Sequence, residues 1–104
     1  MSEPTEIVVL AKVTCQPGKR DEAITALGPM LDHVEGEEGT LRYVLLKDAS
    51  DTDVLWVYEV YRDQAAFDAH SSSEAMKSLG RALGTVLAGR PELIITHPVG
   101  GKGL

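Results

Sequence analysis

Residues 58–70 constrain the fold of this chain more than any other stretch. The first part alternates its side chains as a β-strand does, and after one polar turn an alanine-rich run begins a helix that ends on His70. This geometry predicts that Glu59, Tyr61 and His70 meet at one cavity mouth. Three such side chains are suited to moving protons, so this segment is the best indication of function in the sequence.

The chain has 104 residues, which is the size of a single domain covering residues 1–104. A chain of this length buries roughly two thirds of its unfolded surface. That is enough for a hydrophobic core, but not also for a deep pocket formed by this chain alone. The size therefore leaves room for a partner chain to complete the site.

The formal net charge of −6 argues against two classes of partner. A phosphate backbone and an anionic membrane would both be repelled by the field of the protein, so neither nucleic acid nor membrane is expected as a partner. The sequence contains no apolar run of about 18 residues and no apolar signal core, which predicts a cytoplasmic protein. Cys15 agrees, because a lone thiol forms no internal disulfide.

The hydrophobic pattern predicts seven regular elements between frayed residues 1–5 and a flexible tail at 98–104, with a folded core at about 6–97. Strands are expected at 7–14, 41–46, 54–61 and 92–97, and the first should be central because both its faces are apolar. Helices are expected at about 23–34, 63–69 and 73–87. Pro29 should kink the first helix or split it in two, because proline lacks the N–H that a helix needs.

If the helices at 63–69 and 73–87 are counted as one helical region, the resulting order is βαββαβ. This order predicts an α+β fold with one antiparallel sheet and its helices on one face. The middle two strands should pair as a hairpin, and ligand pockets should lie between the sheet and the helices. The other face would be bare and apolar, so we expect a homodimer whose sheets pack face to face. The residues assigned to the bare face are Ile7, Val9, Ala11, Leu55, Val57 and Tyr61.

Four motifs, in order and spacing, resemble the antibiotic biosynthesis monooxygenase domain family over about residues 6–97. They are Pro17-Gly18-Lys19, Glu38-Gly39-Thr40-Leu41-Arg42-Tyr43, Tyr58-Glu59-Val60-Tyr61 and Ala66-Phe67-Asp68-Ala69-His70. The resemblance implies a ferredoxin-like protomer in a dimeric α+β barrel. It also implies an oxidoreductase that uses O2 without cofactor or metal, on a quinol, a small aromatic or a polyketide-like molecule.

Similar domains include haem-degrading enzymes and an isomerase of a small sugar phosphate. Haem-degrading relatives use an asparagine, a tryptophan and an iron-binding histidine at places that here hold Ala11, His70 and Gly80. The resemblance therefore favours the oxygenase branch over the haem branch, since the iron ligand is missing.

A cofactor-free oxygenase needs a base, a group that stabilises an anion, and an apolar cage. An unperturbed histidine has a pKa of about 6.5, which suits a base at neutral pH, so His70 is the candidate base. Tyr61 is the candidate donor to a developing phenolate, and Glu59 either orients His70 or accepts a proton itself. Nothing in the sequence aims Arg42 or Arg62 inward.

Structural alternatives stay open for each of these residues. His70 can end a helix turn and bond the backbone, and Glu59 can face an edge or form a salt bridge across a dimer. The acidic turn of Glu35, Glu37 and Glu38 is interpreted as a solvated turn rather than a calcium site. At the level of function, a non-catalytic dimer that binds a small ligand, for example in a stress response, and a proton-shuttling isomerase remain as alternatives to the oxygenase.

Overall fold

The β-branched run near the start of the chain forms the central strand of a four-stranded sheet. The computed structural model describes residues 5–103. Strand β1 (Ile7–Thr14) pairs antiparallel with β3 (Val54–Tyr61) on one side and with β4 (Glu92–Thr96) on the other. Strand β2 (Thr40–Lys47) pairs with β3 as a hairpin, which gives the order β2-β3-β1-β4. The central position of the first strand and the hairpin are both confirmed.

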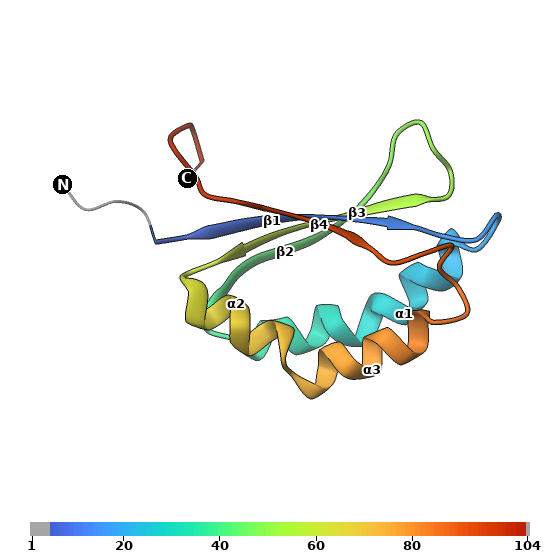
Figure 1. Ribbon diagram of the computed structural model, residues 1–104, viewed down its shortest axis with the longest axis horizontal. Helices are drawn as coiled ribbons and strands as arrows, with labels where there is room; N and C mark the ends of the chain where they lie inside the picture. Colours follow the sequence, from blue (N-terminus) through green and yellow to red (C-terminus); the bar gives the residue numbers. More distant parts are fainter. Residues whose placement is uncertain (1–4, 104) are drawn as a thin grey trace.

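All the helices lie on one face of this sheet (Figure 1). They are α1 (Arg20–His33), the short 3-10 helix η1 (Val34–Gly36), α2 (Gln64–Ser71) and α3 (Glu74–Leu83). Helices α2 and α3 begin at the polar caps Asp63 and Ser73, whose side chains accept hydrogen bonds from backbone N–H groups of the first turn. The predicted α+β class and its ferredoxin-like order are thus confirmed.

The helices differ from the prediction in two respects. Of the two outcomes expected at Pro29, a kink or a split, the split does not occur: α1 is continuous from Arg20 to His33, and Leu27 and Met30, on either side of the proline, are both buried in the core. Helix α3 ends at Leu83 rather than at residue 87. After Gly84 the backbone turns toward the end of β1. The N–H of Gln16, just after this strand, bonds the carbonyl of Val86 at 2.8 Å, and the N–H of Ala88 bonds the carbonyl of Thr14 at 2.9 Å, so tertiary hydrogen bonds take the place of further helical ones.

The residues assigned to the bare sheet face are on the wrong side. Ile7, Val9, Ala11, Leu55, Val57 and Tyr61 are all at most 4% exposed, and they lie on the face that the helices cover. Because both faces of β1 and β3 are apolar, alternation alone does not tell which face meets the helices. The uncovered face carries the other set, including a row that crosses all four strands: Val44, Tyr58, Leu10 and Ile94.

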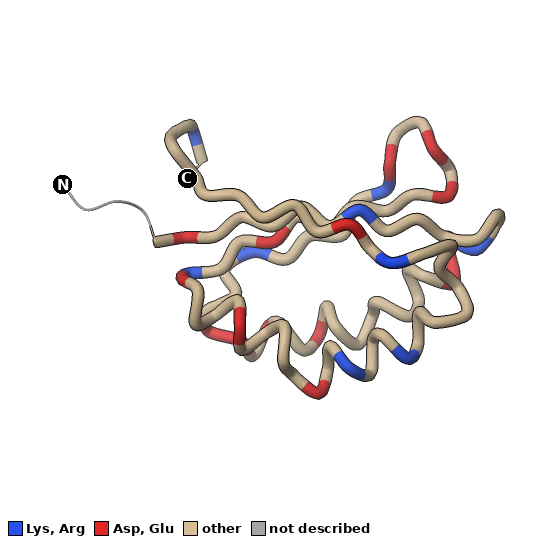
Figure 2. Tube along the Cα trace, viewed as in Figure 1, with Lys and Arg blue, Asp and Glu red and all other residues tan. Residues whose placement is uncertain are grey.

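The connection between β2 and β3 carries several acidic residues, visible at the upper right of Figure 2. Asp48 organises it by accepting hydrogen bonds from the backbone N–H groups of Asp51 and Ser50 and from the indole N–H of Trp56 at 2.8 Å. These bonds, that from Asp51 first, lower the pKa of Asp48 to about 2. The polar loop is therefore ordered by its own side chains.

Some sequence predictions fall outside this description. Residues 1–4, within the segment expected to fray, and Leu104, in the expected tail, are outside the described part of the chain. Residues 97–103 form no helix or strand. None of the helices in residues 5–103 has both the length and the apolar character that a bilayer span needs.

A close backbone approach at Gly39 generates a prediction about stability. A Cβ at this position would collide with the Cβ of Ala66 in α2, while the carbonyl of Gly39 accepts a bond from the N–H of Arg62 at 2.8 Å. We expect Gly39→Ala to lower the free energy of unfolding by about 1–3 kcal/mol, because backbone must move to relieve the clash.

The matched control is Gly36→Ala, where a Cβ meets nothing within 4 Å. Urea unfolding followed by circular dichroism measures both variants. Equal midpoints for the two would contradict the close packing of this loop on α2.

Candidate functional site

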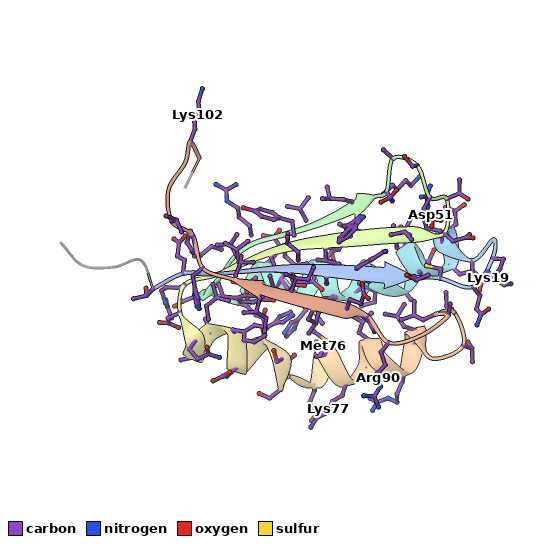
Figure 3. All side chains as sticks on the ribbon, turned by 45° about the horizontal axis from the view of Figure 1, so that its top comes forward. Lys19, Asp51, Met76, Lys77, Arg90 and Lys102 are labelled. Atoms are coloured by element: carbon purple, nitrogen blue, oxygen red, sulfur yellow. The ribbon has the colours of Figure 1, made fainter. Side chains whose placement is uncertain are left out.

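A cavity of about 640 Å³ separates the sheet from helices α1 and α3. Its walls are mostly apolar, with Ala11, Val13, Val57 and Leu93 from the sheet and Leu27, Met76, Leu79 and Leu83 from the helices. Figure 3 labels Met76 on α3 and Arg90 before β4, two further points on its boundary. We call it the inner cavity. Its volume and apolar lining are those of a site for a small organic molecule, and its location confirms the prediction of a pocket between sheet and helices.

Glu59 is the carboxylate that faces the inner cavity. Its side chain points from the middle of β3 to the helix side of the sheet and is 6% exposed. The hydroxyl of Tyr61, two residues along on the same face, donates a hydrogen bond to Glu59 Oε1. Burial raises the pKa of Glu59, and the bond from Tyr61 and the nearby His70 oppose the rise without cancelling it.

His70 lies in the last turn of α2, on the covered side of the sheet, and is 1% exposed. The centroid of its ring is 5.2 Å from that of Tyr61 and 5.4 Å from that of Tyr43. His70 Nδ1 is 2.8 Å from Glu37 Oε1, whereas His70 Nε2 is buried without a hydrogen-bond partner. The histidine is therefore anchored on one side and unpaired on the other.

Glu37 is held in place from several directions. Its Oε1 accepts a bond from the Thr40 hydroxyl at 2.8 Å, and its Oε2 is 3.1 Å from His33 Nε2. Burial alone would raise the pKa of Glu37, but the bonds to His70 and Thr40 and the proximity of His33 lower it overall. Glu37 therefore remains a carboxylate at neutral pH and favours a proton on the Nδ1 of His70.

The two tyrosines of the site are hydrogen-bond donors rather than bases. Burial raises the pKa of both Tyr61 and Tyr43 far above 10, and the charge of Glu59 raises each further. Tyr43, from β2, lines the inner cavity beside Glu59. Among these groups, Glu59 is the one that can accept a proton from a molecule in the cavity.

The predicted trio comes together, but not at one cavity mouth. Of the three, Glu59 borders the inner cavity; Tyr61 lies between Glu59 and His70, and His70 borders a separate surface hollow of about 260 Å³. Strand alternation places Tyr61 correctly, but it does not reveal that the ring of His70 packs on Tyr61 and Tyr43 rather than facing the inner cavity.

The structure also decides between the alternatives for single residues. Glu59 does not face an edge, because its partner is Tyr61 within the same strand. The Nδ1 of His70 bonds a side chain rather than the backbone. Arg62 is exposed beside Asp63, with 3.6 Å between Arg62 Nε and Asp63 Oδ2, and Arg42 borders a hollow on the uncovered face of the sheet.

Sequence reasoning missed Glu37 and Tyr43. Glu37 looked like part of a solvated acidic turn, yet its side chain is only 17% exposed. A usable signal was present two and three residues after Glu37. Gly39 permits a close backbone approach, and Thr40 has a hydroxyl that can bond a carboxylate. Tyr43 shares the covered face with Thr40 because the pairing of β2 with β3 shifts register between Thr40 and Arg42, which plain alternation along the strand does not predict.

Of the three positions compared with haem-degrading relatives, two lie in the inner cavity, whereas His70 does not. Ala11 and Gly80 both line it, and neither has a side chain that can ligate a metal. Within residues 5–103, no three His, Cys, Asp or Glu side chains gather as a metal ion would require.

Comparison with known proteins places this geometry in a family. The model of the antibiotic biosynthesis monooxygenase family matches residues 6–81. A curated relative from Bacillus subtilis, "Putative monooxygenase YcnE", is 27% identical over 67 residues, which are 64% of this chain and 70% of the relative.

Solved structures show the same fold. A protein from Caulobacter crescentus named as a putative antibiotic biosynthesis monooxygenase is 28% identical, with a TM-score of 0.87 over 93% of this chain and 92% of its own. Protein PA3566 from Pseudomonas aeruginosa, at 22% identity, has a TM-score of 0.85 over 96% of this chain and 100% of its own. Since the family model covers most of the chain, including β1 to β3 and the helices that carry the site, this protein belongs to the antibiotic biosynthesis monooxygenase family.

Proposed function

We propose that this protein is a cofactor-independent monooxygenase that oxidises a quinol, an anthrone or another small polyketide-like aromatic with O2. The observation that carries the proposal is a single carboxylate, Glu59, with a raised pKa on the wall of a mostly apolar cavity. The family membership supports the reaction class, and the cavity volume suits a molecule of a few fused rings.

Deprotonation is the step that such a site assists best. O2 reacts slowly with closed-shell molecules, but an electron-rich phenolate or carbanion passes an electron to it readily. Glu59 takes the proton, and its raised pKa brings it closer to the pKa of the acid that it must deprotonate. Glu59 is a better candidate for this base than His70, because Glu59 borders the inner cavity and His70 does not.

The remaining parts of the site fit the rest of the reaction. Tyr43 lines the cavity with a hydroxyl that stays protonated, so it can donate a hydrogen bond to the developing anion. For an activated methylene, the substrate carbon becomes a carbonyl, one oxygen atom enters the product and the other leaves as water. All the electrons that O2 accepts then come from the substrate, and the apolar walls limit competing reactions with water.

The test of the base uses O2 uptake by metal-free protein with hydroquinones, naphthohydroquinones and anthrones. We expect Glu59→Gln to lower kcat/KM by about a hundredfold or more, because the amide accepts no proton. In the wild type, kcat/KM should fall as pH drops through the raised pKa of Glu59, since the protonated acid cannot act as a base. An acidic limb at or below pH 4.5, the ordinary value of a glutamate, would contradict this role.

Two tyrosines of β3 provide a matched control. Tyr61→Phe removes the hydroxyl bonded to Glu59, whereas Tyr58→Phe removes one from the uncovered face. We expect the acidic limb of the pH profile to move upward only in Tyr61→Phe, because that bond stabilises the carboxylate. The same shift in both variants would contradict the specific pairing.

The same assay separates the alternative functions. Saturable binding of these compounds without turnover would point to a ligand-binding protein, and turnover under nitrogen to an isomerase. Uptake at the buffer rate across the panel, by protein shown to be folded, would contradict the oxygenase.

We further propose that the working unit is a homodimer formed through the uncovered sheet face. Val44 and Ile94, at the two ends of the row across the sheet, are 43% and 48% exposed, and Leu41 and Leu46 add to the apolar surface. An exposed apolar face that extends across a whole sheet is unusual for a monomer. Packing against the same face of a second copy covers it.

A single charge on this face tests the dimer. We expect Val44→Glu to convert the protein from a dimer to a monomer at micromolar concentration in multi-angle light scattering, because the carboxylate would be buried between sheets. Thr25→Glu, on the exposed side of α1, is the control that should leave the mass unchanged. A monomeric wild type would contradict the assembly.

A further inference from the structure

Among the buried side-chain nitrogen and oxygen atoms of the described residues, Nε2 of His70 is the one without a hydrogen-bond partner. Buried polar atoms in native proteins are nearly always paired, so an unpaired one needs an explanation. The opposite ring nitrogen is tightly held, at 2.8 Å from Glu37 Oε1. A side chain that is fixed at one nitrogen and open at the other is arranged to receive a proton.

The tautomer follows from Glu37. This carboxylate already accepts a hydrogen bond from the hydroxyl of Thr40 at 2.8 Å, and it has no proton of its own to give to His70. Nδ1 of neutral His70 must therefore carry the proton and donate it to Glu37, which leaves a lone pair on Nε2. The fold thus presents a buried acceptor beside Tyr61 and Tyr43.

The surroundings of this histidine connect two separate hollows. On one side lies Tyr61, whose hydroxyl bonds Glu59 on the wall of the inner cavity. On the other side His70 and Glu37 both border the surface hollow of about 260 Å³. Tyr43, which also lines the inner cavity, packs on His70 as well, with 5.4 Å between the ring centroids, so both tyrosines adjoin the histidine.

We propose that Glu37 is the outer member of a proton path that runs through His70 and ends at Glu59 in the inner cavity. The proposal rests on the function proposed above and adds how Glu59 is returned to its basic form. Glu59 takes a proton from the substrate and passes it to the hydroxyl of Tyr61. The side chain of Tyr61 must move to give its own proton to Nε2, because Nε2 has no hydrogen-bond partner in the structure. Nδ1 then releases its proton to Glu37 and so to water, which leaves the remaining proton of His70 on Nε2, and exchange of the two tautomers restores His70 before the next turnover.

The charged and titratable groups around the path come from three elements and their flanking loops. They are Glu37 and Glu38 from the loop before β2, Tyr43 from β2, Glu59 and Tyr61 from β3, His33 from the end of α1, and Arg62 at the surface hollow. His33 Nε2 is 3.1 Å from Glu37 Oε2, and the His33 side chain is 41% exposed. His33 therefore does not bury Glu37, and the carboxylate can exchange protons with water.

The first test does not depend on activity. Nitrogen NMR of the imidazole distinguishes the two neutral tautomers, and we expect wild-type His70 to carry its proton on Nδ1. Glu37→Gln should give a mixture, because an amide can both donate and accept, whereas Glu38→Gln should leave the wild-type spectrum unchanged. A wild-type proton on Nε2 would overturn the proposal, since the path would then have no acceptor.

The second test uses the best substrate from the O2-uptake panel. We expect Glu37→Gln to lower kcat by about tenfold or more with KM unchanged, to raise the solvent isotope effect in D2O, and to regain rate as buffer concentration rises. A merely structural role would not produce buffer rescue or a larger isotope effect. Glu38→Gln should match the wild type, and melting curves establish that all variants fold.

The two tests separate failure of the path from failure of the proposed function. If Glu59→Gln is inactive but Glu37→Gln has the wild-type kcat and isotope effect, the path is overturned and the oxygenase stands. If the wild type consumes no O2, the proposed function fails, and the tautomer of His70 alone then supports or overturns the path.

Discussion

The burial of one carboxylate is the constraint on which the rest of this site depends. Glu59 lies in the middle of β3 among apolar neighbours, where desolvation disfavours its charge. The hydrogen bond from the hydroxyl of Tyr61 and the nearby His70 stabilise the charge, but they do not cancel the effect of burial. The result is a carboxylate that can change its protonation state at modest cost, which a salt-bridged one would not do. The proposed roles of the apolar cavity beside Glu59 and of the nearby His70 both depend on this property.

The supporting loop matters as much as the strand. Gly39 allows the chain before β2 to lie directly on α2, and this contact sets Glu37 against His70. Thr40 and His33 also form hydrogen bonds with the carboxylate of Glu37. Groups from the two halves of the sequence thereby meet at one place, so the turn that joins the first helix to β2 is part of the site and not merely a connection.

The elements were predictable from the sequence because their patterns are strong and local. The strands at 7–14 and 54–61 have the predicted bounds, and Asp63 and Ser73 mark helix starts by their capping chemistry. What the sequence did not predict depends on tertiary choice. Both faces of β1 are apolar, so Val9 and Leu10 gave no sign of which one meets the helices. For the same reason the site was only half predicted: alternation pairs Glu59 with Tyr61, but the contact of His70 with Glu37 spans 33 residues and leaves no periodic signal.

The most direct test of this account is a carbon-detected NMR titration of the Glu59 carboxyl, assigned by its loss in Glu59→Gln. The account predicts a pKa above the ordinary value of 4.5, because burial outweighs the stabilisation of the charge by Tyr61 and His70. It also predicts that a bound hydroquinone moves this pKa, since the carboxyl borders the cavity that the ligand fills. A pKa at or below 4.5 that does not respond to any of the aromatic ligands would contradict the central claim.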